Sequence, residues 1–390
     1  MESESKTQAP LGAFTAGDTE QKPSLKSITV FLSFSGSGGV EHIIMNLVRE
    51  FARRGVAVDL VLIRARGPHL KDIPEGVRVV QLNAAHTSSA IPELARYLRR
   101  VRPERMLVAK DRAGRAAVIA RSLSKVDVSI CLRLGTNLSE ALSYKSAFNR
   151  WSRLANMRRI YAKVDRVIGI SQGVVDDIRK ITGVPAERCR VICNPVVDES
   201  LILKSKQPLA HPWYQTGSRP LVVGAGRLTQ QKDFATLIRA FAKLREELDA
   251  HLVIIGEGRK RRELEQLVAE LKIQDYVDMP GFQANPYNWI GQADLFVLSS
   301  RWEGSGNVLT EALALGVPSV ATDCPSGPSE TLAGGKYGAL VPVGDYRALA
   351  NQMAQTLRKP LNAEILRSAV KEYEVGFSAE RYLNVVAGIE

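Results

Sequence analysis

Short apolar runs, rich in β-branched residues, alternate with segments of helical periodicity from about residue 26 onward. The run ITVFLSFS precedes a segment in which Ile44, Leu47, Val48 and Phe51 fall at helical spacing. The same alternation recurs around VAVDLVLI, RMLVA, VSICLRL and DRVIGIS. Strands that alternate with helices form βαβ units, which build a mostly parallel sheet. The first half is therefore predicted to be a doubly wound α/β domain.

The alternation is interrupted once, in CNPVVDESLILKSKQPLAHPWYQTGSRP, which contains four prolines and few apolar runs. It then resumes through LVVGAGRL, HLVIIG and DLFVLSS. We therefore predict two doubly wound Rossmann-like domains, over residues 26–205 and 206–375. Ligands of such folds bind at the carboxyl ends of the strands, here in a crevice between the domains.

Composition is that of an ordinary globular protein, with 45% hydrophobic and 24% charged residues among 390. The apolar runs are far shorter than the roughly 20 residues that a membrane-spanning helix needs. Residues 1–25 carry acids where a secretory signal carries bases, so we interpret them as a disordered polar leader of a cytoplasmic protein. The four cysteines form no CxxC pair, which favours reduced buried thiols over a metal site.

The net charge of +12 is concentrated in the first half of the chain. Residues 1–205 hold 33 Lys and Arg against 20 Asp and Glu, whereas residues 206–390 hold 20 against 21. A basic half indicates a polyanionic partner such as anionic lipid, a phosphorylated acceptor or nucleic acid. A solvated basic face is the alternative. Nucleic acid is disfavoured, because no recognised binding motif and no aromatic-basic sheet face is evident.

The stretch SSRWEGSGNVLTEALALGVPSVATDCPSGPSE carries the clearest chemistry. Its turn places Glu303 before a short helix that contains Glu311, and Gly304 and Gly306 let a ligand approach the main chain. A helix start of this kind favours anions. Two carboxylates with an anion site between them suit a ligand with hydroxyls at both ends and phosphate between. The alternative is one acid that complements the helix dipole and one surface acid.

This stretch resembles the donor-site signature of retaining glycosyltransferases of the GT-B fold, family 4. Their E-x7-E motif matches EGSGNVLTE, and the resemblance extends over nearly the whole chain from residue 26. It implies two Rossmann-like domains that face a central cleft, and a helix over 376–390 that returns to the first domain. It also implies that Glu311 holds the ribose hydroxyls and Glu303 the transferred sugar. The backbone of the intervening residues would meet sugar and phosphate: Gly304, Ser305, Gly306, Asn307 and Val308.

Other segments match the same family. In GAGRLTQQK, Arg227 and Lys232 follow a strand and would stabilise the charge that develops on the leaving diphosphate, without a metal or cofactor. In DMPGF, the residues that resemble a base-contacting loop are Met279, Gly281 and Phe282. In SFSGSGGVEH, those that would approach the diphosphate are Gly38 and Gly39, whereas Glu41 and His42 are predicted to lie on a helix surface.

The first half also departs from the family pattern. Many members carry a histidine after the strand VSICLRL, where this chain has RLGTNLS. The residues that occupy this acceptor-side region include Arg133, Thr136 and Asn137. Ser171 aligns with a recurrent serine at a strand end, and a helix N-cap is an equally good interpretation.

Residues 144–166 combine helically spaced apolar residues with seven Lys and Arg. They are interpreted either as a core-packed basic helix or as an interfacial helix that binds the anionic inner face of the cytoplasmic membrane. The resemblance as a whole implies a retaining, metal-independent hexosyltransferase. It would move a sugar from a UDP-linked donor to a lipid-linked or anionic glycan acceptor, with an α-linkage, in bacterial envelope, lipopolysaccharide or polysaccharide biosynthesis. The rival hypothesis is a non-catalytic protein that binds nucleotide sugars or glycans on the same fold.

Overall fold

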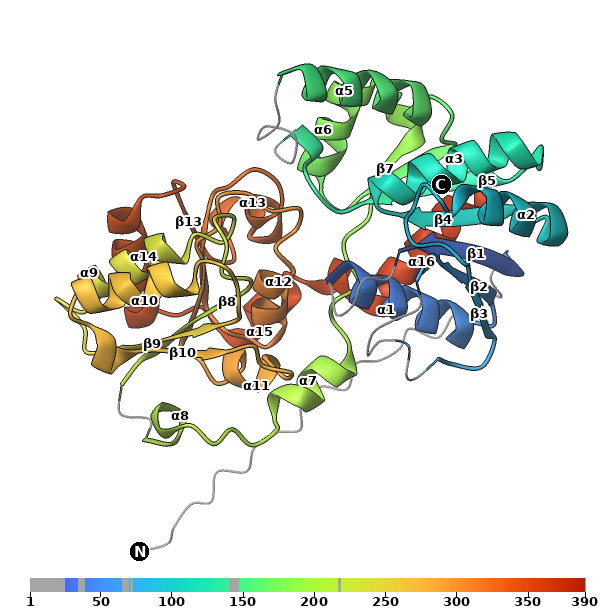
Figure 1. The fold of residues 1–390 in the computed structure, drawn as a ribbon. Helices are drawn as coiled ribbons and strands as arrows, with labels where there is room; N and C mark the ends of the chain where they lie inside the picture. Colours follow the sequence, from blue (N-terminus) through green and yellow to red (C-terminus); the bar gives the residue numbers. More distant parts are fainter. Residues whose placement is uncertain are drawn as a thin grey trace, which may run out of the picture.

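The computed structural model describes residues 25–33, 39–64, 70, 73–139, 147–216 and 219–389. These residues form two α/β domains that lie side by side, as Figure 1 shows. The structure confirms the predicted fold of two doubly wound parallel sheets.

The first domain is built on a seven-stranded sheet in the order β3-β2-β1-β4-β5-β6-β7, in which all described pairs are parallel. Its strands are β1 (Ser27–Leu32), β2 (Ala57–Leu62), β3 (Val77–Gln81), β4 (Arg105–Ala109), β5 (Ser129–Leu134), β6 (Arg166–Gly169) and β7 (Cys189–Val191). Its helices are α1 (Gly39–Arg53), α2 (Ile91–Val101), α3 (Asp111–Ser124), α5 (Ala147–Tyr161) and α6 (Gln172–Thr182).

The second domain has a six-stranded parallel sheet in the order β10-β9-β8-β11-β12-β13. Its strands are β8 (Leu221–Ala225), β9 (His251–Ile255), β10 (Val277–Gly281), β11 (Leu295–Leu298), β12 (Ser319–Thr322) and β13 (Ala339–Val341). Its helices are α9 (Phe234–Leu244), α10 (Arg261–Glu270), α11 (Tyr287–Ile290), α12 (Asn307–Ala314), α13 (Pro328–Thr331), α14 (Tyr346–Arg358) and α15 (Ala363–Ser368).

The central strands are continuous apolar runs because both faces of each sheet are covered by helices. Every residue of β8, β9 and β11 is buried. The helices bury one stripe each, and in α1 this stripe includes Ile44, Leu47, Val48 and Phe51. Because the strands of each sheet are parallel, the loops that follow β1 and β4 lie along one edge of the first sheet. The loops that follow β8 and β11 likewise lie along one edge of the second sheet.

The chain crosses between the domains twice, and the two crossings are hydrogen-bonded to each other. The amides of Val196 and Val197 both donate to Tyr373 O at 3.0 Å, and Val375 N donates to Val197 O at 3.0 Å. Val196, Val197 and Leu201 belong to the core of the second domain. The predicted boundary at residue 205 is therefore too late. Residues 196–205, which include α7 (Glu199–Ser205), pack with the second domain because their apolar side chains complete its core.

The last helix, α16 (Val375–Ala387), lies against the first domain, as Figure 1 shows. It contacts α1, β4 and β5. Its buried residues Tyr382, Leu383 and Val386 join the core formed by β1, β2 and α1. Leu25 is buried in the same core, so it is not part of a disordered leader, as the sequence had suggested. The rest of that leader lies outside the described residues.

This packing predicts that α16 stabilises the first domain from the far end of the chain. Leu383→Ala is expected to lower the free energy of unfolding by about 2–5 kcal/mol, because it leaves a cavity in that core. Ile389→Ala is the control, because Ile389 is 63% exposed and should change stability by less than about 0.5 kcal/mol. Urea unfolding followed by circular dichroism measures both. Equal effects of the two substitutions would contradict the packing.

Candidate active site

The candidate site forms where β11 ends and α12 begins. Ser299 and Ser300 follow the strand and are fully buried. Ser299 Oγ donates to Lys232 O at 2.9 Å, which ties this loop to the loop after β8. Gly306 precedes α12 with φ 72°, a left-handed conformation that glycine adopts without strain. The chain thus turns sharply between the buried end of β11 and the start of α12, and Glu303 lies on this turn.

Glu303 is a buried carboxylate that two side chains hold in place. Lys232 Nζ and Ser300 Oγ each donate to its Oε1 at 2.6 Å. The side chain of Glu303 is 8% exposed and that of Lys232 15%. A buried carboxylate needs such partners, because an unpaired charge is costly out of water. One of its oxygens carries both bonds, and no hydrogen bond to Oε2 from a described residue is present.

The two predicted cations occupy different positions. Lys232 packs along Gly226, whose φ is 152°, and a β-carbon at residue 226 would lie 3.0 Å from Lys232 Cε. Arg227 follows Gly226 directly, but its side chain is exposed, and it belongs to no ion pair among the described residues. The structure therefore brings Lys232 to Glu303 and leaves Arg227 at the surface of the same loop.

Glu311 is the fifth residue of α12, eight positions after Glu303, and is half-buried. Burial raises the pKa of the Glu311 carboxyl to about 7, and the charge of Lys232 opposes this shift only in part. Tyr287 on α11 lies near it. The charge of Glu311, followed by burial, raises the pKa of the Tyr287 hydroxyl. The two predicted acids thus both lie within reach of the positive charge of Lys232.

Three glycines let the neighbouring loops come together beside this site. A β-carbon on Gly256 would lie 1.9 Å from Gly226 O, and one on Gly258 would lie 2.3 Å from Leu228 O. Gly281, with φ 82°, accepts a hydrogen bond from Gly256 N at 2.9 Å. No side chain fits at 256 or 258, so the loops that follow β8, β9 and β10 form one continuous wall.

The predicted base-contacting residues lie at the end of this wall. Met279 is half-buried in the core of the second domain, and its carbonyl accepts a bond from Arg261 Nη2 at 2.7 Å. Phe282 is 69% exposed. A β-carbon on Gly281 would lie 2.8 Å from Glu257 Oε1. An exposed ring beside a glycine and a carboxylate offers a stacking surface and a polar edge.

The start of α12 adds polar groups that lack a protein partner. Ser305 is buried, and its Oγ has no hydrogen-bond partner in the described structure. Asn307 accepts a bond from Asn194 Nδ2 at 2.7 Å, and Val308 is half-buried beside it. The first amides of a helix also have no intrahelical partner. This turn therefore presents hydrogen-bond donors that are available to a ligand.

The loops of the first domain touch this turn directly. Ser171 Oγ donates to Gly304 O at 2.8 Å and accepts from Val174 N, so Ser171 both caps α6 and contacts the second domain. A β-carbon on Gly304 would lie 2.3 Å from Gly135 O. Asn137 Nδ2 donates to Ser326 Oγ at 3.4 Å. Thr136 is exposed between these contacts.

Arg133 connects the first domain to α12 through one intermediate residue. Its Nη2 donates to Asn194 Oδ1, and Asn194 in turn donates to Asn307. Arg133 and Asn194 are both 2% exposed. The residues predicted on the acceptor side are thus brought to the donor-side turn, with Arg133 beneath it.

The turn before α1 departs from the sequence-based expectation. Gly38 lies outside the described residues, and Gly39 is the exposed first residue of α1. Glu41 was predicted on the helix surface, but it is buried and accepts from Lys110 Nζ at 2.8 Å. The helical pattern did not reveal this, because the partner of Glu41 follows β4, 69 residues later.

Two family models match the chain in succession. The description "Glycosyl transferase 4-like domain" matches residues 38–195, and "Glycosyl transferases group 1" matches residues 213–374. Together they span both domains and every loop described above. The chain belongs to the GT-B glycosyltransferases.

Relatives and solved structures that are similar to this chain are also glycosyltransferases. An N-acetylgalactosamine-N,N'-diacetylbacillosaminyl-diphospho-undecaprenol 4-alpha-N-acetylgalactosaminyltransferase of Campylobacter jejuni is 28% identical over 361 residues, 89% of this chain and 93% of the relative. The lipopolysaccharide outer core galactosyltransferase WaaB is structurally similar, with a TM-score of 0.74, 20% identity and coverage of 94% and 100%. HepE of Anabaena, solved with UDP and glucose, has a TM-score of 0.73, 21% identity and coverage of 93% and 100%.

Sequence reasoning missed several residues of this glycosyltransferase's site. Glu330 on α13 accepts from the amides of Gln172 and Gly173 at 2.6 and 3.0 Å, so a carboxylate of one domain caps helix α6 of the other. Ser300 and Asn194 were missed because a lone Ser or Asn carries no pattern. The GEG segment at 256–258 had a signal, since two glycines directly follow an apolar strand.

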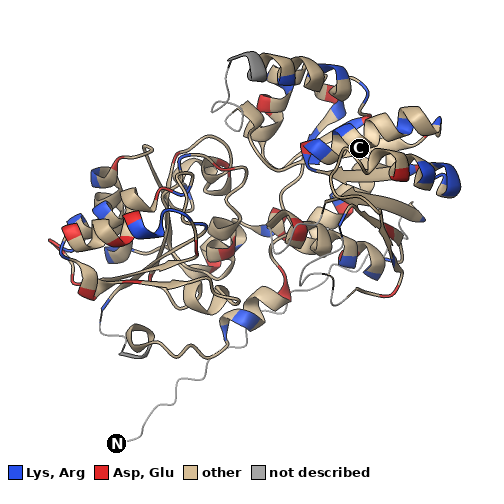
Figure 2. Ribbon diagram, viewed as in Figure 1, with Lys and Arg blue, Asp and Glu red and all other residues tan. Residues whose placement is uncertain are grey.

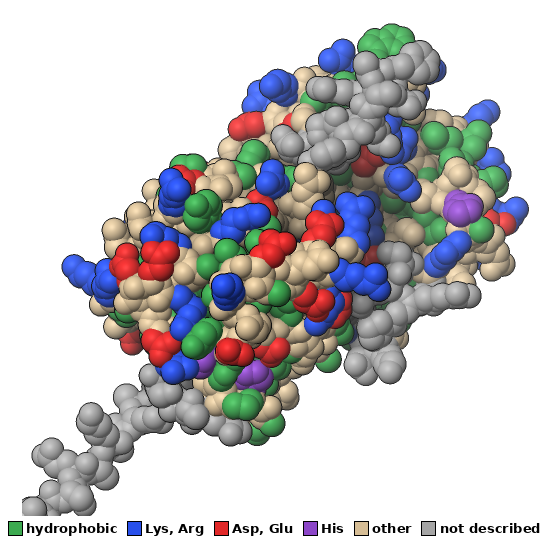
Figure 3. Space-filling model, turned by 60° about the vertical axis from the view of Figure 1, so that its left-hand side comes forward, with side chains coloured by type: hydrophobic (Ala, Val, Ile, Leu, Met, Phe, Trp, Pro, Cys, Tyr) green, Lys and Arg blue, Asp and Glu red, His purple; other side chains and the backbone are tan. Residues whose placement is uncertain are grey.

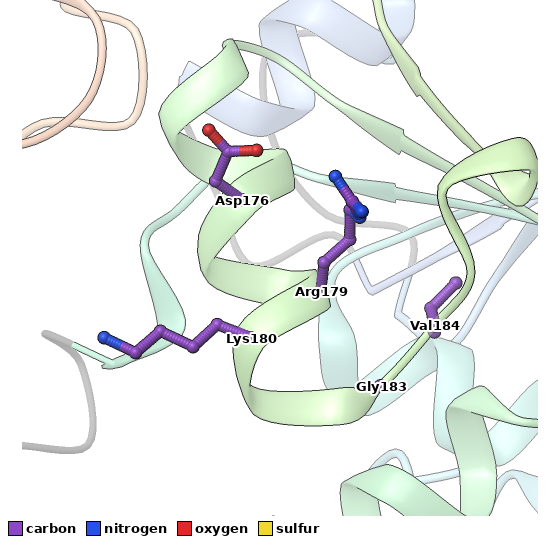
Figure 4. Close-up of a pocket in the computed structure, with 5 residues that line it drawn as sticks. All are labelled: Asp176, Arg179, Lys180, Gly183 and Val184. Carbon is purple, nitrogen blue, oxygen red and sulfur yellow. The ribbon is translucent and has the colours of Figure 1, made fainter.

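Other features of the described structure lie away from these loops. A hollow of about 420 Å³ is lined by Asp176, Arg179, Lys180, Gly183 and Val184, at the opposite end of α6 from Glu330. Figure 4 shows the charged ends of Arg179 and Lys180 pointing in different directions, so they do not converge on one ligand. Among the described residues no three His, Cys, Asp or Glu side chains gather as metal ligands. In the same residues no helix is both long and apolar enough to cross a membrane.

The raised pKa of Glu311 predicts a specific pH dependence of stability. The folded protein holds this proton more tightly than the unfolded chain, whose carboxyl titrates near 4.5. The wild type should therefore lose stability relative to Glu311→Gln as the pH rises from about 4.5 through 7, by about 1.4 kcal/mol for each unit of pKa difference. Urea unfolding at pH 5, 6, 7 and 8 measures the difference. A difference that is constant over this range would show that the carboxyl ionises normally.

Proposed function

We propose that this glycosyltransferase moves a sugar from a UDP-linked donor to a lipid-linked or glycan acceptor, with retention at the anomeric carbon, an α-linkage and no metal. The observation that carries the proposal is the carboxylate of Glu303, fixed by Lys232 and Ser300 at the start of α12. A fixed carboxylate with an unused oxygen suits sugar hydroxyls, and the helix start beside it suits phosphate.

The donor would lie along the loops that follow β8, β9, β10 and β11. Glu303 would accept from hydroxyls of the transferred sugar. Glu311 would accept from the ribose hydroxyls, and a carboxyl whose pKa is about 7 loses its proton when such donors bind. The wall that ends at Phe282 and Gly281 would hold the base.

The diphosphate would lie between the two acids. Ser305 Oγ, which is buried and has no partner in the described structure, would donate to a phosphate oxygen together with the first amides of α12. When the glycosidic bond opens, the leaving diphosphate gains negative charge. Lys232 and Arg227 would stabilise that negative charge in place of a metal ion.

Retention is compatible with the described residues that follow β5, since 135–139 include no histidine or carboxylate that could act as a base. The family histidine is absent, and Arg133, Gly135 and Thr136 occupy that region. A guanidinium and a main-chain carbonyl are poor bases, so the acceptor's proton would pass to the leaving phosphate on the same face of the sugar. The new bond would then form on the face from which the diphosphate departs.

The acceptor assignment rests on charge and on one relative. The relative from Campylobacter jejuni is named for a sugar acceptor that is linked through diphosphate to undecaprenol. Figure 2 shows Lys and Arg positions gathered on α2, α3 and α5 of the first domain. Figure 3 shows acids and bases interspersed on the second domain, in accord with its near-neutral charge. We therefore place the acceptor on the first domain, with a role in envelope polysaccharide assembly.

Helix α5 would bring the enzyme to the membrane that holds such an acceptor. Met157, Ile160 and Tyr161 pack into the core, whereas Trp151 on the preceding turns is 68% exposed. Phe148 lies where the structure describes no side chains. An exposed tryptophan near Arg153, Arg158 and Arg159 suits the interface of an anionic membrane. The enzyme would then act as a cytoplasmic, peripheral protein at that surface.

A non-catalytic protein that binds nucleotide sugars on the same fold is the second candidate, and a direct assay separates the two. The purified protein should bind UDP and slowly hydrolyse a UDP-sugar in excess EDTA, releasing the α-anomer of the sugar. Calorimetry and NMR of the released sugar measure these results. UDP binding without turnover of any donor would favour the second candidate, and activity lost in EDTA and restored by Mg²⁺ would exclude the metal-independent mechanism.

The two cations are expected to differ in their effects. Lys232→Ala should lower kcat by about 10²–10³-fold, because a preorganised charge acts on the transition state, and should also destabilise the protein by leaving Glu303 unpaired. Arg227→Ala should lower kcat with little loss of stability, because Arg227 is exposed. Steady-state kinetics and thermal melts measure both. An unchanged kcat with a raised KM would make the cations donor-binding groups only.

A further inference from the structure

A cavity of about 490 Å³ opens in the first domain beyond the donor-side loops. It lies at the carboxyl ends of β1, β4 and β5, and the residues that form its polar wall are Lys110, Asp111, Arg112, Arg133, Gly135 and Thr136. Gly135 also touches the donor-side turn at Gly304. The cavity therefore adjoins the turn at which the transferred sugar would lie.

Arg133 is a buried cation that no carboxylate of the described residues pairs with. Its side chain is among the largest fully buried ones, its Nε has no hydrogen-bond partner, and among the described residues it forms no ion pair with a carboxylate. Asn194 supplies its one side-chain hydrogen bond. Burial raises the pKa of the Tyr382 hydroxyl beside it, so that group stays neutral. A buried guanidinium is costly unless an anion pairs with it.

Gly135 packs directly against this guanidinium, and both residues line the cavity. A β-carbon at residue 135 would lie 2.9 Å from Arg133 Nη1 and 3.4 Å from Cζ. Any larger residue would have to displace the arginine. An anion in the cavity could therefore approach Arg133 from the side on which this residue lines the cavity.

The start of α3 points to the same kind of ligand. This 14-residue helix begins at Asp111, and no side chain caps its first turn. The first helical bond runs from Gly114 N to Lys110 O at 3.0 Å, so the amides of Asp111, Arg112 and Ala113 precede the hydrogen-bond ladder. All three residues line the cavity. A helix of this length carries partial positive charge at its first turn, which attracts anions.

The acids nearby do not neutralise these groups. Asp111 already pairs with Arg115 at 3.1 Å and accepts from Tyr161 Oη at 3.1 Å. Glu41 takes the charge of Lys110. Arg112 is exposed and forms no ion pair in the described part of the chain. The wall therefore has an excess of positive charge from Arg112, Arg133 and the α3 dipole.

We propose that this cavity binds a phosphate or diphosphate group of the acceptor. The inference rests on the proposed function, since it takes the acceptor to lie on the first domain. Arg133 would bind the anion from below, the first amides of α3 from the side, and Arg112 at the rim. The acceptor's hydroxyl would then extend past Gly135 toward the sugar held at Glu303. Arg133, which lies in the region where family members carry the histidine, would thus serve acceptor binding rather than base catalysis.

The test uses inorganic pyrophosphate as a probe on the full-length protein saturated with UDP. Calorimetry should detect pyrophosphate binding while UDP remains bound. Arg112→Ala should weaken that binding about tenfold, since one charge-assisted hydrogen bond is lost, and Arg112→Lys should restore most of it. Arg99→Ala is the matched control, because Arg99 is exposed on α2 and bonds to Leu123 O, at the opposite end of α3.

Further arms of the same experiment separate the possible outcomes. Arg133→Lys, checked for folding by circular dichroism, should weaken pyrophosphate binding and leave UDP binding unchanged. Farnesyl diphosphate that binds more tightly than pyrophosphate would indicate a prenyl-linked anion, whereas equal affinities would indicate the anionic group alone. Pyrophosphate that binds only when UDP is absent, or equally to wild type and Arg112→Ala, would overturn the inference. Loss of UDP binding in the wild type would instead count against the proposed function.

Discussion

The ion pair between Lys232 and Glu303 joins the loop after β8 to the loop after β11, at 2.6 Å. Both side chains are largely out of water, so each is stabilised mainly by the other and by Ser300. Without this ion pair, the turn that leads into α12 would lose the contact that holds it against the loop after β8. The other parts of the donor side are arranged around it. The wall at Gly256 and Gly281 and the buried Ser305 hydroxyl lie on loops beside this pair, and Glu311 lies on α12, the helix that follows the turn.

Backbone pairing, helix packing and side-chain hydrogen bonds also connect the two domains. The crossings at Val197 and Glu374 form a bridge, and α16 packs back on the first domain. Three further contacts lie near the cleft: Ser171 to Gly304, Asn194 to Asn307, and Glu330 to the start of α6. Most of these bonds involve main-chain groups or short side chains, so a small change in the angle between the domains would break several together. The site is therefore complete only when the domains are close.

The sequence by itself determined the architecture and much of the donor side. Apolar runs of strand length with helical segments between them indicate a parallel sheet with both faces covered by helices, and the interruption between the two series indicates two such domains. The motif EGSGNVLTE placed Glu303 and Glu311 on one turn and helix, because those residues are local in the chain. Local spacing also placed Lys232 near a strand end. Patterns of this kind report which groups share an element, and they were sufficient for the fold.

Only the tertiary structure decided which distant residues meet and in what charge state. Glu41 is buried against Lys110, and Arg133 is buried where no carboxylate of the described residues pairs with it. Both facts depend on strands that are adjacent in the sheet but far apart in the chain. Burial also sets the pKa of Glu311, which no local pattern contains. Hydrophobic periodicity reports the exposure of apolar side chains. It carries no information about a polar residue whose partner comes from another element.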